Sequence, residues 1–189
     1  MIRFRLIFIL LLLSLTSFSQ VIEENRYTWL RGGIGGFKEQ NINKLRGGIF
    51  NLSVNYLTDK YIQKEESIRA VNHLWEIRGD LHINSGDEHT MGLYYDLGLL
   101  YGKSAGDAGK IYICAGLGVM GGWYNVMESV PYKFFGTVKH EFSVLNIPIE
   151  TGFNVNSEKF GIGISGIANI NKTMSTLGIT LHIQLGRLR

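Results

Sequence analysis

Residues 176–186 read Thr-Leu-Gly-Ile-Thr-Leu-His-Ile-Gln-Leu-Gly, and every second residue from Leu177 to Leu185 is apolar. The residues between them, from Thr176 to Gly186, are small or polar. Successive side chains of a β-strand point to opposite faces. This stretch therefore predicts a strand with one apolar face and one polar face.

The same alternation recurs upstream. It covers the segments 27–37, 45–57, 73–84, 90–102, 110–124, 139–155 and 158–170, in the last of which Ile167 falls on the polar face. The eight predicted strands have about 11–17 residues, whereas strands of soluble proteins usually have about 5–6. A strand that crosses a membrane needs about 9–11 residues, so the lengths favour membrane-spanning strands.

The polar faces carry charged residues mixed with glycine, whereas the aliphatic runs that oppose them, such as Phe50 to Tyr56 and Leu177 to Leu185, carry no charge on the apolar face. Lipid-facing surfaces must be free of charge, and strands can cross a bilayer only as a closed barrel. We therefore expect an all-β fold, an eight-stranded antiparallel up-and-down transmembrane β-barrel. The expected polar cluster in its lumen, as a structural network of ion pairs, is Arg31, Glu76, Arg78, Asp80, His82, Asp96, Glu150 and His182.

Large aromatic residues fall near the ends of the predicted strands. If both chain termini are periplasmic, the expected periplasmic girdle on the lipid face is Tyr56, Trp75, Tyr101, Phe153 and Phe160, with Trp123 at the opposite rim. Aromatic side chains favour the two membrane–water interfaces, so these positions support the membrane interpretation.

The first 19 residues have the pattern of a secretory signal peptide. Arg3 and Arg5 precede an apolar run from Leu6 to Leu13, and Ser17 and Ser19 occupy the small-residue positions of a cleavage site. We expect cleavage before Gln20, one barrel domain over 20–189, and a protein exported to the outer membrane.

Composition excludes several other classes of protein. The 24 glycines occur with only 2 prolines, which argues against a collagen-like or disordered chain. The single cysteine, Cys114, excludes a disulfide scaffold. Without 1–19 the chain has 17 basic and 16 acidic residues, which gives no electrostatic indication of nucleic-acid binding.

The predicted connections fall at two ends. We expect periplasmic connections at 58–72, 103–109 and 156–157, and outer loops at 38–44, 85–89, 125–138 and 171–173. Segment 58–72 is long and charged for a periplasmic turn. It could form a short amphipathic helix, a soluble extension, or a polar start to the third strand after a tight turn at Asp59-Lys60.

The closing stretch contains Asn169-Ile170-Asn171-Lys172, Gly178 and Gly186-Arg187-Leu188-Arg189. With the strand pattern over 27–189, it resembles small outer-membrane β-barrels of Bacteroidota, similar to the eight-stranded OmpA/OmpX-like class. The resemblance implies a barrel in contact with outer-membrane lipid and with the barrel-insertion machinery during biogenesis.

The main functional hypothesis is a structural or binding barrel that meets a partner or ligand at its outer loops, without cofactor, metal or catalytic residues. A second hypothesis is a lipid-modifying enzyme, for which Ser85, His89, His140 and Ser143 lie near the outer rim, although no spacing joins a serine to a histidine. A third is a secreted, lipocalin-like soluble barrel that binds a small apolar ligand inside.

Overall fold

The computed structural model describes residues 20–40, 46–64, 67–85, 91–106, 109–129 and 135–188. The expected signal peptide at 1–19 lies outside the described residues and stays a prediction.

Eight β-strands account for nearly all of the described chain. They are β1 (Gln20–Glu39), β2 (Arg46–Lys64), β3 (Ser67–Ser85), β4 (Met91–Ala105), β5 (Gly109–Ser129), β6 (Phe135–Asn156), β7 (Phe160–Ile170) and β8 (Thr176–Arg187). No helix among the described residues is long and apolar enough to cross a membrane.

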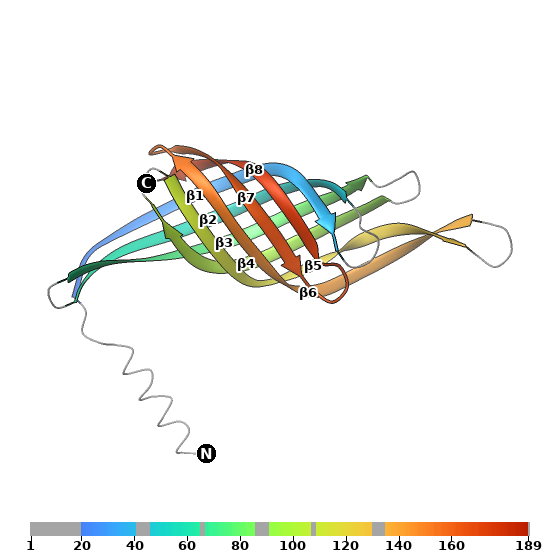
Figure 1. Ribbon diagram of the computed structural model, residues 1–189, viewed down its shortest axis with the longest axis horizontal. Coiled ribbons are helices and arrows are strands. Elements are labelled where there is room, and N and C mark those ends of the chain that lie inside the picture. The colour runs from blue at the N-terminus through green and yellow to red at the C-terminus, as the bar shows by residue number, and fades with distance from the viewer. Residues whose placement is uncertain are drawn as a thin grey trace, which may run out of the picture. The chain divides into compact units, whose positions relative to one another are not determined.

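The strands form a closed barrel in the order β1 to β8 (Figure 1). Neighbouring strands run antiparallel, and β1 closes the ring against β8 with Arg31 opposite Gln184. Closure gives every strand two partners, so the backbone groups of the ring pair internally. The predicted fold, an eight-stranded antiparallel up-and-down barrel, is confirmed.

The chain divides into two compact units. The barrel unit comprises Tyr27–Leu57 and His73–Arg189. The described part of the second unit consists of residues 20–26, 58–64 and 67–72, which belong to strands β1, β2 and β3. The assignment of 20–189 to one domain stays a prediction.

Several connections are shorter than the sequence predicted. Segment 58–72 is almost entirely strand: β2 continues to Lys64 and β3 begins at Ser67, so neither a helix nor a turn at Asp59-Lys60 forms. Most of the expected outer loop 125–138 also extends β5 and β6, which pair as far as Ser129 with Phe135. These residues lack an apolar face, but backbone pairing within a hairpin does not require one.

Side chains alternate between the barrel interior and its outer surface. In β4 this alternation is unbroken from exposed Met91 to buried Gly102. We call the end where β1 ends at Glu39 and β4 begins at Met91 the loop end, and the end where β4 ends at Ala105 and β8 ends at Arg187 the terminal end.

Candidate functional site

Arg31 of β1 is a centre of the buried charged network inside the barrel. It is 1% exposed, and its guanidinium group forms ion pairs with Glu76 of β3 and with Glu150 of β6, the latter at 2.6 Å between Nη1 and Oε1. Nη1 also donates a hydrogen bond to the Tyr112 hydroxyl at 2.7 Å, and that hydroxyl donates to Glu150 Oε1 at 2.6 Å. Arg31 thus ties three other strands together across the lumen.

Arg78 of β3 is the second centre. Its guanidinium nitrogens lie 3.1 Å from Asp80, 2.9 Å from Asp96 and 3.3 Å from Glu150. Its Nη2 also donates a hydrogen bond of 2.7 Å to Asn169 Oδ1. Glu150 contacts both arginines and so joins the two centres into one lumen charge cluster, which we define as Arg31, Glu76, Arg78, Asp80, Asp96 and Glu150.

The two histidines expected in this cluster lie beside it. His82 is buried, and its ring packs edge-to-face with the ring of Phe37, with centroids 4.8 Å apart. The Nε2 atom of His182 lies 2.7 Å from Asn154 Oδ1. All eight predicted lumen residues are therefore buried, but only six form the joined network.

Neutral polar side chains complete the network, and the sequence analysis did not single them out. Asn146 donates a hydrogen bond of 2.8 Å to Asp96, and Asn51 donates one of 2.5 Å to Asp80. Both lie on inward-facing strand positions, which is the signal that could have identified them.

A layer of buried apolar side chains lies on each side of the charge cluster. The layer toward the loop end consists of Phe37, Ile49, Tyr94, Met120, Tyr124, Ile167 and Met174. The layer toward the terminal end consists of Trp29, Leu57, Leu74, Leu100, Tyr112, Cys114 and Leu188. Ile167, the exception in the sequence pattern, thus packs inside the barrel.

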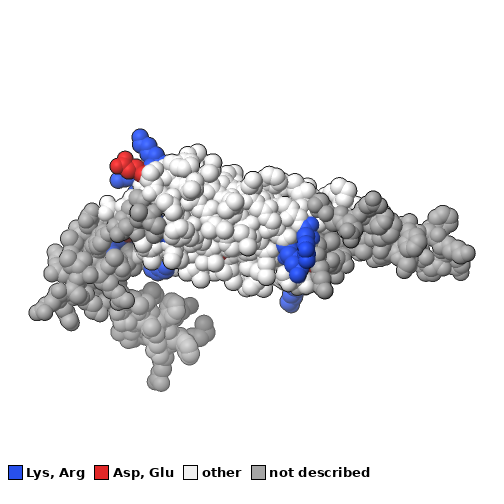
Figure 2. All heavy atoms as spheres, turned by 45° about the horizontal axis from the view of Figure 1, so that its top comes forward, with Lys and Arg blue, Asp and Glu red and all other residues white. Residues whose placement is uncertain are grey.

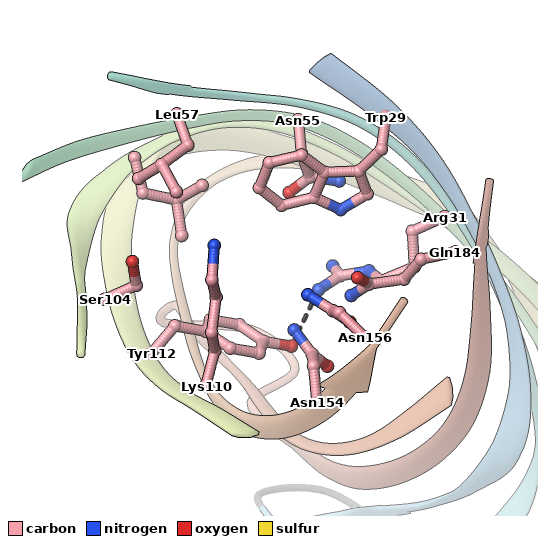
Figure 3. Close-up of a pocket in the computed structure, with 11 residues that line it drawn as sticks. Trp29, Arg31, Asn55, Leu57, Ser104, Lys110, Tyr112, Asn154, Asn156 and Gln184 are labelled. Carbon is pink, nitrogen blue, oxygen red and sulfur yellow. Dashed lines mark hydrogen bonds between the residues drawn. The ribbon is translucent and has the colours of Figure 1, made fainter. Parts of the chain in front are cut away.

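A small pocket lies next to the terminal-end layer (Figure 3). Eleven residues line it, and its volume of about 10 Å³ is comparable to the space needed for one water molecule. Lys110 and Trp29 point into this space, and Arg31 with its hydrogen bond to Tyr112 forms the inner wall. The pocket is too small for an organic ligand of ordinary size.

The outer surface of the barrel is apolar, the reverse of a soluble protein. Long aliphatic side chains such as Leu117 (76% exposed) and Leu145 (82% exposed) cover it. In the face shown in Figure 2, charged residues gather toward the ends and leave a broad uncharged band between them. A monomeric soluble protein rarely exposes an apolar area of this extent.

The aromatic residues expected at the periplasmic rim all point outward. Tyr56, Trp75, Tyr101, Phe153 and Phe160 are each between 36% and 47% exposed. Trp75 and Tyr101 are direct cross-strand partners with ring centroids 4.7 Å apart. Trp123 is partly buried, and Lys139 lies over its ring at 5.5 Å.

The residues considered for a lipid-modifying enzyme do not assemble into a nucleophile–base pair where the structure describes them. His140 faces inward and stacks on Tyr124 with ring centroids 5.2 Å apart, whereas Ser143, three residues later, is exposed on the opposite face of β6. His89 and the side chain of Ser85 lie outside the described residues. Within the described part of the chain, no group of three His, Cys, Asp or Glu residues is placed to hold a metal ion.

Neither a protein-family model nor a curated protein sequence matches the chain. Solved structures do match. Neisserial surface protein A aligns over 86% of this chain and 98% of its own, with a TM-score of 0.58 and 10% identity. The chain has the fold of a small outer-membrane β-barrel.

Two further outer-membrane barrels support this fold. The N-terminal barrel domain of OprF from Pseudomonas aeruginosa covers 87% of this chain and 99% of its own, at 11% identity and a TM-score of 0.50. Ail, the attachment invasion locus protein of Yersinia pestis, gives the same coverages and TM-score at 14% identity. At these identities the likeness shows the barrel fold alone.

Proposed function

We propose that the protein spans the outer membrane as a closed barrel with a structural or binding role, its loop end at the cell surface and its termini in the periplasm. The observation that carries this proposal is the reversed polarity of the barrel: buried Arg31, Arg78 and Glu150 lie inside, and exposed aliphatic side chains lie outside. Only a lipid environment stabilises both arrangements at once.

The outward aromatic residues support the placement in the membrane. Trp75 and Tyr101 lie near the terminal end on the outer surface, where their rings would meet the lipid headgroups. They and the other aromatic residues named above form the proposed interfacial girdle.

The filled interior supports a role without transport. The lumen charge cluster lies between two groups of buried apolar side chains, and the adjacent pocket has room for about one water molecule. The same packing argues against a lipocalin-like function, because a lipocalin needs an apolar cavity large enough for its ligand. A partner or ligand would then meet the barrel at its loop end.

Planar-bilayer recording tests the closed interior. We expect the folded protein, inserted into a bilayer, to give no stable conductance steps. Insertion is checked separately by flotation of the protein with lipid vesicles, and folding by comparing the gel migration of boiled and unboiled samples, which differs for a stable closed barrel. Reproducible conductance steps that rise in proportion to salt concentration would contradict a closed interior.

A further inference from the structure

The outer surface of β1, β2 and β8 carries a groove near the loop end. Its volume is about 890 Å³. Gly36 and Gly48 form its floor, and apolar side chains including Ile34, Phe50 and Ile179 form its walls. These three side chains are 51–63% exposed.

The two floor glycines are not required by the packing of the barrel. A Cβ atom on Gly36 would have its nearest neighbour at 3.6 Å, and one on Gly48 at 4.0 Å, which is ordinary van der Waals distance. The inward-facing glycines beside them differ: a Cβ on Gly35 or Gly47 would overlap the backbone of the next strand. The inward pair is therefore explained by close strand approach, whereas the outward pair only keeps the groove open.

Two cations lie at the loop end of this groove. Lys38 follows Gly36 by two residues on β1, and Arg46 precedes Gly48 by two residues on β2. The alternation of a strand places each cation on the same outward face as its glycine, and both side chains are exposed. Lys38 also lines the groove.

The charge of the whole loop end is positive on its described surface. Its exposed charged side chains are Lys38, Arg46, Lys139, Glu141 and Lys172, and Glu141 is already paired with Lys139 at 2.7 Å. An apolar groove that ends at two exposed cations complements a molecule with an acyl chain and a phosphate group.

We propose that the groove over Gly36 and Gly48 binds an acyl chain of lipid A, with a lipid A phosphate held by Lys38 and Arg46. This inference rests on the proposed function, because it requires the loop end to lie in the outer leaflet. The barrel thus selects its lipid at one face, while the rest of its apolar surface takes any lipid chain.

Native mass spectrometry of the full folded protein in zwitterionic detergent measures the binding directly. The number of lipid A molecules retained is followed over a range of lipid A concentrations, with zwitterionic phosphatidylcholine as the comparison without net charge and phosphatidylglycerol as the anionic one. We expect lipid A to be retained at lower concentrations than either phospholipid.

Variants separate the headgroup site from the groove. Lys38→Gln with Arg46→Gln should raise the dissociation constant of lipid A by about 30-fold, because each cation near an anionic headgroup contributes about fivefold. Gly36→Leu with Gly48→Leu should fill the groove and lower retention of lipid A without disturbing the backbone.

Matched controls lie outside the groove. Gly32→Leu changes an outward β1 glycine with open space around it, and Lys139→Gln removes another loop-end cation. Both should leave lipid A binding unchanged.

Two results would overturn the proposal: retention of lipid A by both double variants at the wild-type level, or an equal loss of binding in the controls. Gel migration of boiled and unboiled samples is recorded on the same preparations. A protein that forms a stable barrel but does not prefer lipid A refutes this inference alone, whereas a protein that does not form a stable barrel refutes the proposed function as well.

Discussion

Replacement of Arg78 by methionine should be among the most destabilising single changes in the barrel. Its guanidinium group contacts the carboxylates of Asp80, Asp96 and Glu150 at 2.9–3.3 Å, all of them fully enclosed. Methionine fills a similar volume but leaves three buried carboxylates without this cation. Removal of one partner from a buried ion pair costs about 3–5 kcal/mol, and Arg31 can offset the loss only at Glu150.

Urea unfolding in phosphatidylcholine vesicles, followed by tryptophan fluorescence, measures this loss. We expect the free energy of unfolding of Arg78→Met to fall by about 3–5 kcal/mol relative to the wild type. Lys139→Met is the matched control, because it removes an exposed cation that is paired with Glu141. Its unfolding midpoint should equal that of the wild type, since exposed ion pairs contribute little.

A second variant keeps the reasoning testable if Arg78→Met does not fold. Asp96→Asn removes one of the carboxylates that Arg78 neutralises, so adding it to Arg78→Met should restore part of the lost stability. An Arg78→Met protein as stable as the wild type would refute the proposed role of the charge cluster. A double variant whose loss in free energy of unfolding equals the sum of the two single-variant losses would refute the same role.

Two further predictions concern the packing of the interior. Gly35→Ala should lower the free energy of unfolding, measured by urea titration, by about 2 kcal/mol or more, because the added methyl group overlaps the carbonyl oxygen of Ile179. Gly32→Ala, with open space around the added methyl group, should change this free energy by less than about 0.5 kcal/mol. Equal effects of the two substitutions would contradict the prediction. Cys114 is 2% exposed inside the barrel, so a maleimide should modify its thiol in urea but not in the folded protein, as measured by the mass shift. Rapid labelling of the folded barrel would show that water reaches the interior freely.

The sequence predicts the fold well because a barrel strand repeats its pattern every two residues. This period alone assigned Arg31, Glu76 and Glu150 to the interior and Trp75 to the outer surface, as the structure has them. The same logic identified eight strands without knowledge of their partners.

Strand length and pairing could not be read in the same way. Residues 58–64 and 67–72 are strand although they lack an apolar face, because the backbone of a hairpin pairs whatever its side chains are. Which carboxylates meet Arg78 depends on the register of strands distant in sequence, such as β3 and β6. Strand alternation separates Gly35 from Gly36, but it does not show that a Cβ atom would overlap the neighbouring backbone at Gly35 and not at Gly36.

The central claim is that lipid covers the outer surface while the interior is closed to it. Two single-tryptophan variants test this in bilayers of brominated phosphatidylcholine, whose bromine atoms quench fluorescence only on close approach. One variant keeps Trp75, which is 45% exposed on the outside, and the other keeps Trp29, which is 7% exposed in the lumen. We predict strong quenching of Trp75 and little quenching of Trp29. Equal quenching of both, or quenching of neither, would contradict the account.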